Sequence, residues 1–208
     1  RIVNMGLISN GTTLLDAGAI DSGISTGSMV LIKTLTANNS ANLTFLHGSS
    51  DVVFDSTYKE YVFKIINSHP STNPGIISFQ ATTDGTNYNT TVTSTYFRAF
   101  NNEGDTSTGL GYAVNFDQAQ GTAVQNLDSG SGSGNHEASS GTLTIFNPAD
   151  TTFVKHFIGQ VSDENDGDFN HNVFTAGYFN TTSALTGIRF QLDSGNFDQG
   201  TIKMYGIK

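Results

Sequence analysis

The sequence predicts an all-β protein, an antiparallel, jelly-roll-like β-sandwich that follows an extended N-terminal arm. Gly, Ser, Thr and Asn dominate its polar positions and charged residues make up only 13% of the 208 residues, a composition that favours strands and turns over helices. Residues 188–192 alternate strictly, with Ile188, Phe190 and Leu192 on one side, as in a sheet with one buried face. Short strand-like runs between turn clusters, without a helical period, favour a sandwich over other architectures.

The strand-like runs are rich in β-branched and aromatic residues and are bounded by turn-forming residues. They lie at residues 43–46, 61–66, 76–81, 96–100, 142–146, 153–158, 173–179, 188–192 and 201–208. The 15 Phe residues are enough for a packed core. We expect the core to contain Phe63, Ile65, Phe79, Leu143, Ile145, Phe190 and Leu192.

Three connections carry turn signals. Asp84-Gly85 tolerates positive φ and predicts a tight hairpin turn, and residues 193–196 predict a hairpin-like link between the last two strands. Residues 129–135 alternate Ser and Gly, which predicts an exposed, mobile loop because ordering glycine costs backbone entropy.

Residues 1–40 differ from the rest of the chain. The stretch from Met5 to Ile20 is small, apolar and interrupted by Gly, with neither a helical period nor sustained alternation. We interpret residues 1–40 as an arm or attachment segment and residues 41–208 as the sandwich domain. The alternative is that the arm supplies a first strand and loops of the same domain.

Charge and cysteine content exclude several classes of function. The net charge of −9, with 9 basic and 18 acidic residues, argues against nucleic-acid binding and against an anionic membrane surface. The chain has no Cys, which excludes disulfides, thiol catalysis and Cys-bound zinc. No apolar run approaches the length of a membrane-spanning helix.

No pattern in the sequence identifies a catalytic, cofactor-binding or metal-binding residue, and we expect no cofactor and no enzymatic activity. The acidic run from Asp163 to Asp168 has Gly167 at the fifth position and lacks the closing Glu of a calcium loop, which favours a solvated turn. His156 alternates with apolar neighbours and is expected to be a packed strand residue. Gly109-Leu110-Gly111 is too short for a phosphate loop.

Two weaker possibilities for ligand binding concern isolated residues. The other histidines have no metal-ligand spacing and are interpreted as single surface or core residues; they are His47, His69, His136 and His171. Tyrosines flanked by polar residues can present a glycan-binding surface. The candidates are Tyr88, Tyr112 and Tyr178, although strand aromatics more often fill the core.

Several segments, in the order in which they stand, give the chain a resemblance to a known domain. They are 54–63, 69–72, 80–85, 120–123, 140–148, 176–180 and 194–207. Over about residues 50–208 the chain resembles a domain that recurs in structural proteins of tailed phages, notably marine phages that infect cyanobacteria. The resemblance implies a virion structural protein without a catalytic motif, and residues 1–40 lie outside it.

The resemblance leaves two places on the particle open. A head decoration or cement protein sits on the capsid lattice, often as a trimer, and can use an arm as a clamp. A tail fibre or spike tip binds a host glycan or receptor, but fibres generally carry a long stem, and no heptad repeat is present. We therefore expect a non-enzymatic decoration protein on the virion surface, made in the bacterial cytoplasm. The expected partners are the major capsid protein or another virion protein and copies of the chain itself, as a homotrimer or another symmetric homo-oligomer.

Overall fold

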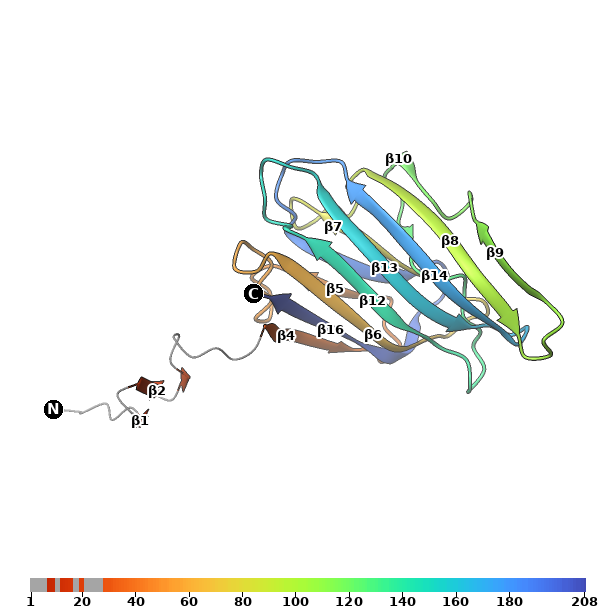
Figure 1. Cartoon of the computed structure of the whole chain (residues 1–208), viewed down its shortest axis with the longest axis horizontal. Helices are drawn as coiled ribbons and strands as arrows, with labels where there is room; N and C mark the ends of the chain where they lie inside the picture. The colour runs from red at the N-terminus through yellow and green to blue at the C-terminus, as the bar shows by residue number, and fades with distance from the viewer. Residues whose placement is uncertain (1–6, 10–11, 17–18, 21–27) are drawn as a thin grey trace.

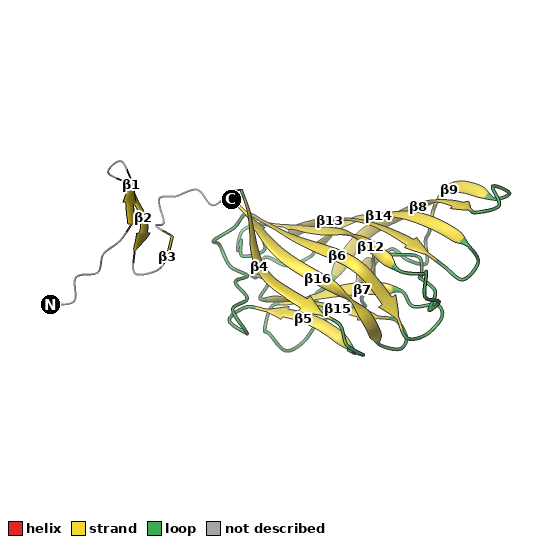
Figure 2. Cartoon of the chain, turned by 90° about the horizontal axis from the view of Figure 1, so that it is seen from below, coloured by secondary structure: helices red, strands yellow, loops and turns green. Residues whose placement is uncertain are grey.

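The computed structural model describes residues 7–9, 12–16, 19–20 and 28–208. Over these residues the protein contains strands and no helix, so no described helix is available to cross a membrane. Two antiparallel sheets pack face to face as a sandwich (Figures 1 and 2). The predicted antiparallel β-sandwich is confirmed.

The larger sheet has nine strands in the order β10-β8-β14-β13-β12-β6-β16-β4, with β9 paired to β8. Its strands are β4 (Met29–Thr36), β6 (Glu60–Pro70), β8 (Val92–Asn102), β9 (Thr108–Tyr112), β10 (Ala119–Gly121), β12 (Ser139–Phe146), β13 (Lys155–Glu164), β14 (Phe169–Phe179) and β16 (Phe197–Ile207). The smaller sheet has the order β11-β7-β15-β5, formed by β5 (Asn42–Leu46), β7 (Ile77–Thr82), β11 (Gln125–Asn126) and β15 (Gly187–Leu192).

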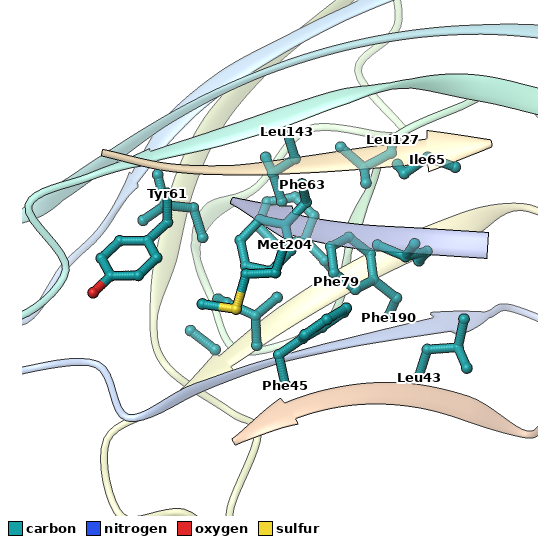
Figure 3. Packing of buried hydrophobic residues seen from close by; sticks show 14 of the residues in the cluster. Leu43, Phe45, Tyr61, Phe63, Ile65, Phe79, Leu127, Leu143, Phe190 and Met204 are labelled. Atoms are coloured by element: carbon teal, nitrogen blue, oxygen red, sulfur yellow. The ribbon is translucent and has the colours of Figure 1, made fainter. Parts of the chain in front are cut away.

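The core lies between the two sheets and is centred on aromatic rings (Figure 3). Phe190 of the smaller sheet lies 5.3 Å from Phe63 and 6.2 Å from Phe45, measured between ring centroids. Phe79 packs at 5.1 Å against Phe157 of the larger sheet. All the residues predicted for the core are buried: Phe63, Ile65, Phe79, Leu143, Ile145, Phe190 and Leu192. Alternation along the strands therefore identified the inward face correctly for most of the chain.

Each predicted run corresponds to a strand, from β5 to β16, whereas β9, β10 and β11 were not predicted. Residues 29–36 form β4, which pairs with β16 at the edge of the larger sheet. The sandwich therefore includes residues that the sequence analysis assigned to the arm. Within the rest of the arm, β1 (Leu7–Ser9), β2 (Thr12–Asp16) and β3 (Ala19–Ile20) form their own antiparallel sheet. Residues 1–6, 10–11, 17–18 and 21–27 lie outside the described part.

Both hairpin predictions are wrong. The Asp84-Gly85 turn follows β7 of the smaller sheet and leads to β8 of the larger sheet, and residues 193–196 link β15 to β16 across the same gap. Gly85 does adopt the positive φ that the signal implies, at +79°. The local turn chemistry was identified, but it cannot show whether the next strand joins the same sheet or the opposite one.

The prediction of an exposed, mobile loop at residues 129–135 is also wrong for its first half. Gly130, Ser131 and Gly132 are buried, and Ser131 exchanges two backbone hydrogen bonds with Gly75, at 2.9 and 3.1 Å. A Cβ atom on Gly130 would lie 3.2 Å from the Pro74 side chain. Gly130 also adopts a φ of +104°, which glycine tolerates and other residues rarely adopt, so glycine at this residue reflects backbone conformation and packing rather than mobility.

Candidate binding site

The larger sheet extends past the smaller one at its β8–β9 end, and we call this region the overhang: strand β9 and residues 97–102 of β8 (Figure 2). The burial of the inward residues of β8 shows where the smaller sheet and its connections stop covering this strand. Val92, Ser94 and Tyr96 are buried, whereas Arg98 and Phe100 on the same face are only half-buried. The Tyr96 hydroxyl donates to the Asp128 carbonyl at 2.7 Å, so the segment after β11 closes the core at that residue.

A cavity of about 380 Å³ opens on the inward face of the overhang. We call it the overhang pocket; it is lined by Arg98, Phe100, Ser107, Ser129, Asn165, Phe169 and His171. These residues come from β8, β14 and three connecting segments, which register and chain crossovers bring together. Its volume lies at the small end of the range for ligand sites in proteins.

Strand β9 contributes no inward side chain to the overhang. Register pairs Arg98 with Gly111 and Phe100 with Gly109, and directly opposite residues of an antiparallel pair project from the same face. A Cβ atom on Gly109 would lie 2.7 Å from the Phe100 ring, whereas a Cβ atom on Gly111 would meet nothing within 4 Å. The glycines that the sequence analysis had only excluded as a phosphate loop therefore leave the inward face beside Arg98 open.

Asp163 and His171 form an oriented pair at the back of the overhang pocket. They are register partners on β13 and β14, and His171 Nδ1 lies 2.6 Å from Asp163 Oδ1. The Asp163 carboxylate is fully buried and also accepts the Ser129 N–H at 2.9 Å. A carboxylate at this distance fixes the orientation of the imidazole and leaves Nε2 of His171 as the ring nitrogen available to a ligand.

A second buried carboxyl group lies behind this pair. Asp128 Oδ1 accepts the backbone N–H groups of Ile77 at 3.0 Å and Gly130 at 3.2 Å, and the Ser139 hydroxyl donates to Oδ2. Burial, and next the Asp163 carboxylate, raise the pKa of Asp128 well above its usual range. Asp128 therefore fastens the connecting segment to two strands and contributes no charge to the pocket surface while it is protonated.

Aromatic rings line one side of the pocket. Phe169 and His171 are nearly parallel, at 10° with 6.2 Å between centroids, and Phe100 meets Phe169 edge-on at 5.9 Å. Aromatic faces beside hydroxyl and amide groups provide both apolar contact and orientation for a polar ring-shaped ligand. Ser107, Ser129 and Asn165 supply these polar groups.

Arg98 is the charged residue of the pocket, and its guanidinium group has no hydrogen bond or ion pair with any residue in the part of the chain that the structure describes. Arg189, by contrast, lies 3.8 Å over the Tyr88 ring. A guanidinium group presents donors in a planar fork that matches a carboxylate or phosphate. An arginine in a cavity, with no partner for its guanidinium group among the described residues, therefore favours an anionic ligand at this site.

The pocket does not assemble a nucleophile with its base. The Ser129 hydroxyl bonds to Tyr96 at 3.0 Å, and no described hydroxyl hydrogen-bonds to Nε2 of His171. Over the described residues, no group of three or more His, Asp or Glu side chains gathers closely enough to hold a metal ion. The arrangement is suited to binding and orienting a ligand.

The structure separates most of the residues that the sequence singled out. Asp163 is buried rather than solvated, because it pairs with His171. The packed position predicted for His156 is wrong: its side chain is exposed, and the inward neighbour is Lys155, whose Nζ donates to two backbone carbonyls. The apolar neighbours Val154 and Ile158 had indicated that the side of the strand carrying His156 faces the core, whereas this side faces outward.

The three candidate tyrosines do not form one surface. Tyr88 lies against Arg189, and Tyr112 lies on the outer face of β9. Tyr178 of β14 lies beside His156 of β13. His47 accepts the Phe54 N–H at 3.2 Å, and His136 is 3.9 Å from Glu164. Arg98, Phe100 and Phe169 were missed because only the pairing of β8 with β14 shows that they converge.

A second, larger cavity of about 660 Å³ is lined by residues of the loop 133–138 and by His69. His69 Nδ1 is 2.6 Å from Asp198, and Nε2 is 3.0 Å from the Gly134 carbonyl. Burial, which lowers the pKa of His69, is outweighed by these two hydrogen bonds, so the pKa is raised. Both ring nitrogens are therefore occupied, and the pair serves as a clamp between β6, β16 and the loop.

No family model, curated protein or solved structure matches this chain.

Proposed function

We propose that this protein is a non-enzymatic structural protein on the surface of a tailed-phage particle, and that it decorates the capsid. The phage assignment is supported by the resemblance of residues 50–208 described above. The observation that carries the role in attachment is the outer face of the larger sheet. No described strand covers this face, and large apolar side chains are exposed on it at Leu31, Phe97, Leu110, Tyr112 and Ile158.

The outer face supports an interface because its apolar residues form rows across several strands. Tyr112, Phe97 and Phe174 are register neighbours, and the rings of Phe97 and Phe174 stack at 5.1 Å. Exposed apolar groups of this extent usually mark a protein contact. The occupant that we propose is a protein of the capsid lattice, because the resemblance of residues 50–208 implies a virion structural protein.

Co-sedimentation with particles that lack the protein tests this function. The full chain should bind, and Ile158→Glu should weaken binding because it places a charge at the centre of the outer face. Phe153→Glu is the matched control, since Phe153 is exposed outside the strands. Binding that is equal for the full chain and Ile158→Glu, or absent for the full chain, would overturn the proposal.

The arm has a separate test. Because β4 belongs to the sandwich, the informative truncation removes residues 1–27 and leaves residue 28 onward. We propose that the arm contacts a neighbouring subunit in a homotrimer or another symmetric homo-oligomer. Analytical ultracentrifugation should then show an oligomer for the full chain and a folded monomer for the truncated chain. If the full chain and the truncated chain had the same oligomeric state, the arm would not be needed for oligomerisation.

A tail fibre or spike tip that binds a host-surface glycan is the second candidate. The overhang pocket favours it, because an open cavity with aromatic rings, polar groups and an arginine is typical of a site for a polar ligand. The two roles are compatible on one particle, since the outer face and the pocket lie on opposite faces of β8 and β9. Binding of a soluble glycan at the pocket, together with no binding to particles that lack the protein, would favour the role as a tail fibre or spike tip.

A further inference from the structure

We propose that the overhang pocket binds an acidic sugar, with Arg98 holding the carboxylate of a hexuronic acid residue and the aromatic side of the pocket contacting its ring. This inference deepens the glycan-binding candidate and does not depend on how the protein attaches to a particle. The charge of the site points to the ligand class. Arg98 is a half-buried guanidinium without a partner among the described residues, in a cavity with no ionised carboxylate on its lining.

The apolar side of the pocket argues for a ring rather than a bare anion. Phe100 and Phe169 line the cavity together with the imidazole of His171. A free phosphate or acetate would gain nothing from these rings. A pyranose ring presents C–H groups to aromatic faces and hydroxyl groups to the polar atoms at the rim.

The hydrogen-bonding groups complete the match to a sugar. With Nδ1 committed to Asp163, Nε2 of His171 is the ring nitrogen that remains to hydrogen-bond a hydroxyl group of the sugar. Ser107, Ser129 and Asn165 add hydroxyl and amide groups around the same cavity. The buried Asp163 keeps the imidazole orientation fixed, so this nitrogen is in place before the ligand arrives.

Space beside Arg98 is provided by Gly111. A Cβ atom there would meet no protein atom within 4 Å, and the residue lies opposite Arg98 in the β8–β9 ladder. A side chain at residue 111 can therefore be tolerated by the fold, and it would project beside Arg98 on the face that carries the overhang pocket. This gives a steric test that is independent of charge.

The experiment is a titration of the full chain with trigalacturonic acid by isothermal calorimetry, with the carboxyl-reduced, neutral form of the same trisaccharide as the matched ligand. We expect saturable binding of the acidic form alone. Arg98→Gln should weaken it at least about tenfold, the loss that a charge-assisted hydrogen-bond pair brings. Lys64→Gln removes the same charge from an exposed residue of β6 and should change nothing.

The steric test uses Gly111→Thr, which should weaken binding of the acidic trisaccharide as strongly as Arg98→Gln does. Its control is Leu110→Thr on the outer face, which should leave binding unchanged. Only variants that unfold at the wild-type temperature are compared. Acetate and inorganic phosphate, titrated separately, should bind far more weakly than the trisaccharide. Equal binding of the neutral trisaccharide, wild-type affinity in Arg98→Gln, or phosphate binding as tight as that of the sugar would overturn the proposal. None of these results would affect the particle-binding test.

Discussion

The core and the overhang share strand β8, and the overhang pocket also takes residues from its neighbour β14, yet the inward side chains of the two regions differ. Where the smaller sheet covers these two strands, the inward side chains are buried, as at Val92, Tyr96 and Phe179. Past that cover, the same faces carry Arg98, Phe100 and His171 around a cavity. The difference shows that the second layer determines whether an inward residue stabilises the fold or remains available to a ligand.

The largest effect is expected at the centre of the covered region. Phe190→Ala removes a fully buried ring that contacts Phe45 and Phe63, and should lower the free energy of unfolding by about 3–5 kcal/mol. Chemical denaturation measures this loss. Phe153→Ala, at a 70% exposed residue, is the control and should change stability by less than about 0.5 kcal/mol. Similar losses in both variants would show that the core has been placed wrongly.

The next effect tests the carboxyl group that joins the core to the overhang. Asp128→Ala leaves two backbone N–H groups and the Ser139 hydroxyl without their acceptor, and should cost about 1–3 kcal/mol. Asp128→Asn keeps the acceptor oxygen and removes the ionisation.

The pH dependence of Asp128 has a definite sign. Because the folded-state pKa is raised, its contribution is full below the unfolded pKa of about 4 and is lost as pH rises through the folded pKa. The stability of Asp128→Asn relative to wild type should therefore increase with pH from about 4 upward. A difference that stays constant over that range would contradict the raised pKa.

A smaller effect is expected at the His69 clamp, far from the overhang. Its raised pKa means that the ionised contact with Asp198 stabilises the fold fully below the unfolded pKa of about 6.5 and is lost as pH rises through the folded value. The difference in thermal stability between wild type and His69→Gln should be largest in acid and should shrink above neutrality. A difference that grows with pH would give the wrong sign for this account.

The smallest effect on stability is expected at the overhang itself. Arg98→Gln should change the free energy of unfolding by no more than about 0.5 kcal/mol, because the guanidinium has no partner in the described structure. Chemical denaturation of Arg98→Gln and Phe190→Ala under the same conditions compares the overhang and the core directly through their free energies of unfolding. A loss above about 2 kcal/mol would show that Arg98 serves the fold, as a buried charge with a lost partner would.

The sequence predicted the covered region well and the overhang poorly, for a physical reason. Alternation in residues 188–192 reports burial under a second layer, so the core residues followed from it. The pocket depends on register between strands far apart in the sequence, such as β8 and β14, whose pairing sets Phe100 opposite His171 and Arg98 opposite Val173. No local pattern encodes these pairings.

The Gly-rich segments show the same limit. Alternating Ser and Gly predicted mobility at residues 129–135, yet Gly130 is buried, has a φ of +104° and packs against the Pro74 side chain. Gly109 and Gly111 carried no interpretation beyond a failed phosphate loop until β9 was found beside β8. A glycine needed for close packing and a glycine in a flexible loop have the same sequence signature, and only the neighbouring strand distinguishes them.

The most direct test of the proposed function is a cryo-electron microscopy reconstruction of the tailed-phage particle on which we propose that this protein lies. We predict the sandwich on the capsid surface, with Phe97, Leu110 and Ile158 of the outer face against a lattice protein and the overhang pocket with Arg98 open to solvent. A reconstruction with the pocket buried against the lattice and the outer face in solvent would contradict the account, as would particles without this protein on their surface.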